Sequence, residues 1–182
     1  MRLEEIKKEI EIPEGVEVKI EDKTLTVKGP KGENQKTLLY PSLSTSVQDN
    51  KVALSIKNAT KKDKTMIGTF QAHVRNLIKG IREGFIYKIK VCSGHFPMTL
   101  ANEDNTLVIN NFMGEKVPRK AKILSGVEVN IEGDIITLSS FDKEKVGQSA
   151  ANIELATRRA GFDKRVFQDG CYIIEKAGKE IK

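Results

Sequence analysis

The sequence is poor in the residue types from which most catalytic and metal sites are built. Its 182 residues contain no Trp, two Cys and two His, and only 5% are aromatic. His73 and His95 stand apart, and neither belongs to a closely spaced group of Cys, His and Asp of the kind that a metal ion needs. No GxSxG, HExxH or P-loop pattern occurs. These absences predict a protein that is not an enzyme and has no catalytic residues, cofactor or metal.

Long apolar runs are missing as well. No stretch approaches the roughly 18 consecutive apolar residues that a membrane span needs. The first 15 residues carry several acidic side chains and no apolar run, which predicts that they are not a secretory signal. Cys92 and Cys171 could form a disulfide, but without a signal we expect two reduced, partly buried thiols. We therefore expect a cytoplasmic protein with no membrane partner.

Positive charge is the main compositional feature that is present. The formal net charge is +6, and 38% of the residues are hydrophobic, enough for a folded chain. Residues 1–83 hold 16 cationic and 12 acidic side chains, and residues 84–182 hold 15 and 13, so the excess of positive charge is divided between the two halves. A basic balance favours a polyanionic partner through the release of counterions.

The first half of the chain shows several strand patterns followed by one helix pattern. Alternation over residues 16–20 and 24–28 predicts a hairpin, residues 36–40 a further strand, and residues 47–56 a second hairpin. Residues 1–12 read as a tail or an edge strand. Thr60, with Asp63 three residues later, resembles a helix N-terminal cap. The helix predicted after it has these apolar residues near one face: Met66, Ile67, Phe70, Val74, Leu77, Ile78 and Ile81.

The second half repeats this order. We expect strands at residues 85–91 and 98–101, a hairpin over 106–123, a second hairpin over 127–139, and a helix from about 142 to 158. Thr24-Leu25 precedes Gly32 by the same spacing as Thr106-Leu107 precedes Gly114. The repeat predicts an α+β fold of two similar domains that arose by internal duplication, each an antiparallel sheet packed with one helix. The expected domains are residues 1–83 and 84–182, and residues 159–182 form a basic C-terminal extension without a counterpart.

Cations concentrate in two segments of the second half. Lys116, Arg119, Lys120 and Lys122 follow one another closely, with only Glu115 opposing them. The segment from residue 158 onward is also rich in Arg, whose planar guanidinium grips phosphate oxygens. We favour contact with RNA or another polyanion over an ordinary solvated surface. The cations of the first helix fit a solvated face equally well. Low aromatic content favours folded RNA, bound by shape and phosphate, over stacking on single strands.

Several uncommon strings then occur in a familiar order. They are HFP at 95–97, NFMGEK at 111–116 with Arg119, Lys164-Arg165 leading to FQDG at 167–170, Tyr172, and the GPKG turn at 29–32. Across nearly its whole length the chain resembles ribosomal large-subunit protein six, numbered nine in older eukaryotic naming, in its archaeal and eukaryotic form. The resemblance implies a structural constituent of the large ribosomal subunit. It also implies rRNA binding mainly through the second domain, near the sarcin–ricin loop and the region where translation factors bind.

The resemblance also implies which residues and partners serve that role. Partners would be the large-subunit rRNA, neighbouring ribosomal proteins and nearby translation factors. Phosphate contact is expected from the cations Lys116, Arg119, Lys120, Arg158, Arg159, Lys164 and Arg165. His95, Phe96, Asn111 and Phe112 are expected to shape the site, and Gly114 to permit close backbone approach. A module whose exposed edge strands pair with another protein is the alternative from a different class.

Overall fold

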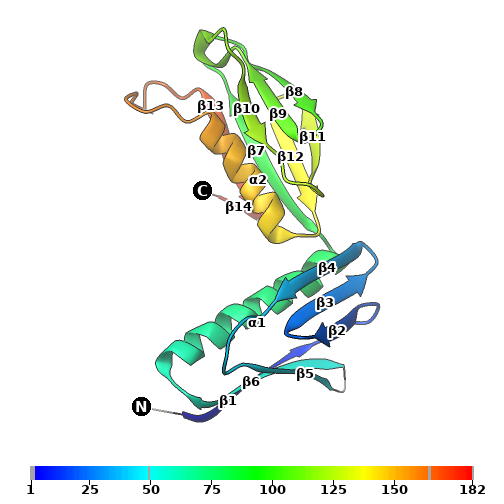
Figure 1. The fold of residues 1–182 in the computed structure, drawn as a ribbon. Coiled ribbons are helices and arrows are strands. Elements are labelled where there is room, and N and C mark those ends of the chain that lie inside the picture. The colour runs from blue at the N-terminus through cyan, green and yellow to red at the C-terminus, as the bar shows by residue number, and fades with distance from the viewer. Residues whose placement is uncertain (1–2, 49, 164, 182) are drawn as a thin grey trace. The chain divides into compact units, whose positions relative to one another are not determined.

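The structure is a computed structural model that describes residues 3–48, 50–163 and 165–181. It divides into two compact units, the first ending at Gly84 and the second beginning at Phe85 (Figure 1). Each unit combines antiparallel sheets with one α-helix and has its own buried apolar core. The predicted α+β class is confirmed, with one difference in detail. The strands of each unit form two sheets, where the sequence had predicted one.

The first unit contains two three-stranded sheets and the longer helix. One sheet has the order β1-β6-β5 and the other β2-β3-β4. The element bounds are β1 Leu3–Glu11, β2 Glu17–Glu21, β3 Thr24–Gly29, β4 Gly32–Thr37, β5 Ser44–Gln48, β6 Lys51–Ala59 and α1 Lys61–Arg82. The strand predicted at 36–40 is therefore shifted, since β4 ends at residue 37.

Helix α1 begins where its capping residues predicted. The Thr60 backbone N–H donates to Asp63 Oδ2 over 2.7 Å, and the Asp63 backbone N–H donates back to Thr60 Oγ1 over 3.4 Å. Tyr40 Oη donates to Asp63 Oδ1 over 2.5 Å. These hydrogen bonds from Thr60 and Tyr40 lower the pKa of the Asp63 carboxyl to about 2. The apolar stripe predicted for the helix is buried in the core of the unit except for Met66, which is partly buried.

The second unit contains a three-stranded and a five-stranded sheet. Their orders are β10-β9-β8 and β11-β12-β7-β13-β14. The element bounds are β7 Phe85–Cys92, β8 Thr99–Glu103, β9 Thr106–Asn110, the 3-10 turn η1 Phe112–Gly114, β10 Arg119–Lys122, β11 Glu128–Glu132, β12 Ile135–Ser140, α2 Lys143–Ala156, β13 Gly170–Lys176 and β14 Lys179–Glu180. The hairpin predicted over 106–123 is present, with Arg119 opposite Ile109 and Lys120 opposite Val108.

The two units repeat the same arrangement of strands. The order β1-β6-β5 corresponds to β7-β12-β11, and β2-β3-β4 corresponds to β8-β9-β10. An equivalent backbone hydrogen bond occurs in both units. In the first unit Ile12 N, just after β1, donates to Asn50 O over 2.9 Å, and in the second unit Val91 N, near the end of β7, donates to Asp134 O over 2.8 Å. One strand breaks the symmetry. Strand β13, which lies in the predicted C-terminal extension, pairs with β7 inside the five-stranded sheet.

Candidate functional site

Three irregular segments meet at one end of the second unit. They are the loop 93–98 after β7, the connection 111–118 between β9 and β10, and the segment 157–169 between α2 and β13. Asn111 Nδ2 donates to the Pro97 carbonyl oxygen over 3.0 Å, and the Gly94 N–H donates to Asp169 Oδ1 over 2.5 Å. The predicted residues of the 95–97 and 111–116 strings are therefore brought together, although long stretches of sequence separate the segments.

The 111–118 connection has a backbone that restricts its sequence. Asn111, Met113 and Gly114 all have left-handed φ angles, of 58°, 50° and 77°. A Cβ added to Gly114 would lie 3.3 Å from Phe96 Cζ, because the Phe96 ring covers this position. Only glycine meets both requirements without strain. The Phe96 ring occupies the space that a Cβ at Gly114 would need, and the close approach of this backbone to RNA stays a prediction.

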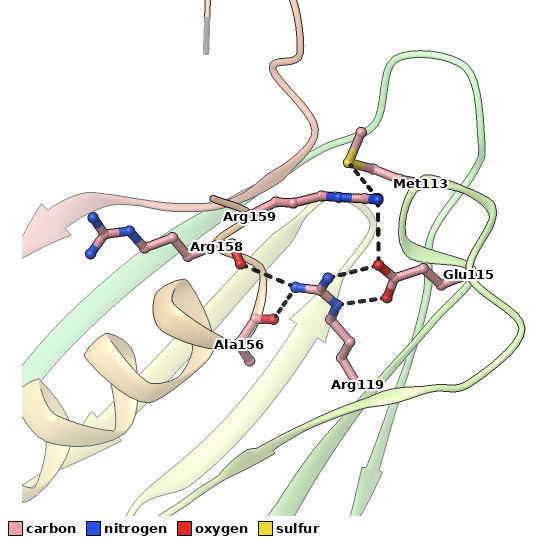
Figure 2. A network of polar contacts seen from close by, with 6 residues as sticks. All are labelled: Met113, Glu115, Arg119, Ala156, Arg158 and Arg159. Carbon is pink, nitrogen blue, oxygen red and sulfur yellow. Dashed lines mark hydrogen bonds and ion pairs between the residues drawn. The ribbon is translucent and has the colours of Figure 1, made fainter. Parts of the chain in front are cut away.

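Arg119 is the centre of a polar network that ties these segments to helix α2. Its Nε donates to Glu115 Oε2 over 2.8 Å and its Nη2 to Glu115 Oε1 over 2.7 Å, a two-pronged pairing (Figure 2). Its Nη1 donates to the carbonyl oxygens of Ala156 at 2.8 Å and Arg158 at 3.3 Å. Hydrogen bonds from Arg119 also lower the pKa of the Glu115 carboxyl. Arg119 thus satisfies carbonyls at the C-terminal end of α2, whose last turn has no cation of its own.

The network leaves Arg119 little capacity for an outside anion. A guanidinium has five N–H donors, and four of them are directed at oxygens of this chain. Its carbon Cζ also lies 4.2 Å from the centre of the buried Phe112 ring. These contacts of Arg119 are all made within this chain, and Phe112 lies in the core beneath it.

Arg159 extends the network toward the aromatic residues of the 157–169 segment. Its Nη1 lies 3.6 Å from Glu115 Oε1 and 3.9 Å from Met113 Sδ. Its Cζ stands 4.3 Å from the centre of the Phe162 ring, and Phe162 packs edge-to-face on Phe167 at 4.9 Å. Both Phe rings are more than a third exposed. Sequence reasoning missed this aromatic pair because the low average content concealed a local concentration.

The other cations expected to contact phosphate differ in whether another residue of the chain already pairs with them. Lys116, Lys120 and Arg158 are exposed, and no described residue offers their side-chain nitrogens a hydrogen-bond or ion-pair partner. In Figure 2 the Arg158 side chain points away from the network while its carbonyl faces Arg119. Arg165 is exposed but pairs with Asp163 at 2.9 Å. Lys164 lies outside the described residues.

A cavity of about 330 Å³ opens beside the network. It lies between η1, the end of α2 and the 157–169 segment. Its walls include the rings of Phe162, Phe167 and Tyr172 and the side chains of Arg158 and Arg159. Aromatic faces and guanidinium groups around one hollow are the combination on which proteins stack bases that leave a nucleic acid helix. His95 stands edge-on to Phe96 at 4.9 Å on the neighbouring loop.

Both thiols are free, and they differ in environment. Cys171 is buried, and burial raises the pKa of its thiol to about 11. Its backbone N–H donates to Thr157 Oγ1 over 2.9 Å. Cys92 is partly exposed. Within the described ranges no three metal-binding side chains gather around one point, and no described helix is long and apolar enough to cross a membrane.

The fold and this site define a class of duplicated α+β proteins with a cationic end and no catalytic constellation among the described residues. The family described as Ribosomal protein L6 matches residues 12–84 and again residues 101–170, one match in each unit. The chain is 47% identical over 171 residues to the large ribosomal subunit protein uL6 of Methanobrevibacter smithii, covering 94% of this chain and 96% of that protein. It is likewise 47% identical over 175 residues to uL6 of Methanosarcina mazei, covering 96% and 99%.

The chain belongs to the ribosomal protein L6 family. The resemblance seen in the sequence is therefore confirmed, including its archaeal type. The family consists of ribosomal proteins and not of enzymes, as the absence of catalytic motifs predicted.

Proposed function

We propose that the second unit binds the large-subunit rRNA through the end formed by the loop 93–98, the connection 111–118 and the segment 157–169. Membership in the family makes the chain a structural protein of the large ribosomal subunit. The binding site would lie near the sarcin–ricin loop and the region where translation factors bind. Neighbouring ribosomal proteins and bound translation factors would be its other partners in the cytoplasmic ribosome.

The observation that carries this proposal is the set of unpaired cations at this end. Lys116, Lys120 and Arg158 have exposed side chains with no partner among the described residues. Three such cations on adjoining elements can contact neighbouring phosphates, because RNA backbones present closely spaced negative charges. Arg165 joins them if a phosphate displaces Asp163, since both side chains of that pair are exposed.

Other residues of the site would act indirectly. Arg119 holds the 111–118 connection against the end of α2, and Gly114 leaves room for the Phe96 ring beside that connection. Arg159 is shared between Glu115 and the Phe162 ring, so it connects the network to the cavity. In this proposal the network fixes the geometry and the unpaired lysines and Arg158 supply the charge.

A matched pair of charge reversals tests the assignment. Lys116→Glu with Lys120→Glu changes the second unit, and Lys61→Glu with Lys62→Glu changes two exposed lysines at the start of α1. Both double variants change the net charge equally. Each lost phosphate contact should lower the slope of log affinity against log salt by roughly 0.7 to 0.9. We expect the second-unit variant to lose nearly two such contacts and the first-unit variant to change little.

Filter binding to large-subunit rRNA across a salt series measures the slopes, with circular dichroism to confirm folding. Equal losses in both variants would mean that net charge alone drives binding, and the second-unit assignment would be wrong. A module that works only through strand pairing would instead show almost no salt dependence.

A further inference from the structure

The first unit has a groove at the place where the second unit holds a strand. The groove has a volume of about 680 Å³ and runs between the end of β1 and the last turns of α1. Ile10, Ile12 and Ile78 form its apolar lining, and Arg75 and Arg82 stand on its helix side. We refer to it as the β1 groove. All of its lining residues belong to the first unit.

The duplication shows what this place accommodates. The bond from Ile12 N to Asn50 O matches that from Val91 N to Asp134 O, so Ile12 corresponds to Val91. By the same register Ile10, which faces Val52, corresponds to Ile89, which faces Ile136. The β1 residues that line the groove are therefore the counterparts of the β7 residues that pair with β13.

In the second unit a strand fills the equivalent place. Strand β13 runs antiparallel to β7, with Cys171 opposite Val91 and Ile173 opposite Ile89. Cys171 is buried, and its N–H donates to Thr157 next to the end of α2. In the described part of the first unit, β1 pairs with β6 alone and forms the edge of its sheet. After α1 the described chain continues directly into β7 and supplies no strand to this edge of the first sheet.

The free edge of β1 presents backbone groups suited to such pairing. In an antiparallel ladder successive residues direct their N–H and C=O groups to opposite sides. The Ile12–Asn50 bond shows that even-numbered residues face β6. Glu9 and Glu11 therefore direct their backbone groups outward. An edge of this kind is a template for another strand unless something covers it.

We infer that the β1 groove binds an extended segment of another protein, which adds to the first sheet as a strand antiparallel to β1. Apolar side chains at alternate positions of that segment would lie opposite Ile12 and Ile10, just as Cys171 and Ile173 lie opposite Val91 and Ile89 in the second unit. An acidic side chain would face Arg75 or Arg82, because no described residue gives these guanidinium groups a partner. The nearby Lys51 and Lys79, in contrast, lie 3.9 Å from carboxylates of Glu9 and Glu83.

Site-specific photo-crosslinking in assembled large subunits tests this inference. A photoreactive amino acid replaces Glu9 in one variant and Glu11 in another, and subunits that contain each variant are purified and irradiated. Their side chains point to one face of the sheet, two residues apart. Mass spectrometry should map both crosslinks to one segment of one protein. The Glu9 crosslink should fall about two residues C-terminal to the Glu11 crosslink, because antiparallel pairing reverses the direction.

Two further variants separate backbone pairing from side-chain contact. Glu9→Pro removes an outward N–H without removing a bond to β6, a position at which edge strands tolerate proline. Combined with the photoreactive residue at 11, it should reduce crosslinking to the level of a control label at Gln48 on β5, the other edge of this sheet. Glu9→Gln should leave crosslinking unchanged.

Crosslinks from both positions to rRNA would overturn the inference, and would assign the arginines of the groove to phosphate. Crosslinks that follow no antiparallel order, that fall within this chain itself, or that do not exceed the Gln48 control would also overturn it. These outcomes are independent of the second unit, whose RNA site is measured by the salt series above.

Discussion

Substitutions of Arg119 distinguish most clearly between two functions of a cation at this site, holding the site together and contacting an anion. We expect Arg119→Ala to destabilise the second unit substantially. The pairing with Glu115 at a partly exposed site contributes about 1 kcal/mol. Each hydrogen bond to the Ala156 and Arg158 carbonyls contributes about 1 kcal/mol. The expected decrease in the free energy of unfolding is therefore about 3 kcal/mol.

Arg119→Lys is the more informative substitution, because it keeps the charge. A lysine cannot reproduce the two-pronged contact with Glu115 and reach both carbonyls as well. It should therefore cost nearly as much stability as alanine. If Arg119 acted mainly on phosphate, lysine would instead preserve both stability and RNA affinity.

Lys120, the next residue on β10, is the matched control. Its side chain is exposed and has no partner among the described residues. Lys120→Ala should change stability by less than about 0.5 kcal/mol. It should lower the salt slope of rRNA binding by roughly 0.7 to 0.9. Arg119→Ala should leave that slope almost unchanged under conditions in which the variant is folded.

Urea unfolding followed by circular dichroism, with amide exchange to assign the loss to residues 85–181, measures stability. Filter binding across a salt series measures the slope. If Arg119→Ala keeps its stability within about 0.5 kcal/mol and loses one full phosphate contact, the positioning function is refuted.

Three further predictions concern the stability and reactivity of the fold. A Cβ at Gly29 would lie 2.5 Å from a buried side-chain atom of α1, so Gly29→Ala should lower the stability of the fold by about 1 to 3 kcal/mol. A Cβ at Gly68 of α1 would meet open space, so Gly68→Ala should raise the stability by up to about 1 kcal/mol. Thermal unfolding of the two variants compares these effects. Because folding lowers the pKa of Asp63 to about 2 from 3.8, its stabilising effect is complete above pH 3.8 and is lost as the pH falls toward 2; Asp63→Asn should remove that part of the acid dependence in a pH series of urea melts. Maleimide at pH 8 should label Cys92 long before Cys171, and equal native rates would contradict the burial of Cys171.

Local sequence signals were sufficient for the elements that depend on near neighbours. Helix α1 was predicted from its Thr60 cap and apolar spacing, because both signals lie within the helix itself. The β9–β10 hairpin was predicted from alternation around a short connection. Membership in the family was predicted from several rare strings in order, and the comparisons confirm it.

Long-range pairing was not accessible in the same way. Strand β13 pairs with β7, so Cys171 lies opposite Val91 although most of the sequence of the second unit separates them, and no local pattern specifies that pairing. The use of Arg119 was hidden for a similar reason. Its carbonyl acceptors belong to residues at the end of α2. Every residue has a backbone carbonyl, so the sequence does not indicate which residue will accept such a hydrogen bond. The spacing of cations predicted where charge would gather, but not which cations would be left free.

The left-handed turn at residues 111–114 has a consequence for the thermodynamics of binding. Non-glycine residues in this conformation cost about 1 to 2 kcal/mol each, and Asn111 and Met113 both adopt it. The cost falls on folding, where the packing around Phe96 and the Arg119 network offset it. A ligand that docks on this connection does not need to order it, so little conformational entropy remains to be lost on association. Binding here should accordingly show a small heat-capacity change and fast, nearly rigid docking.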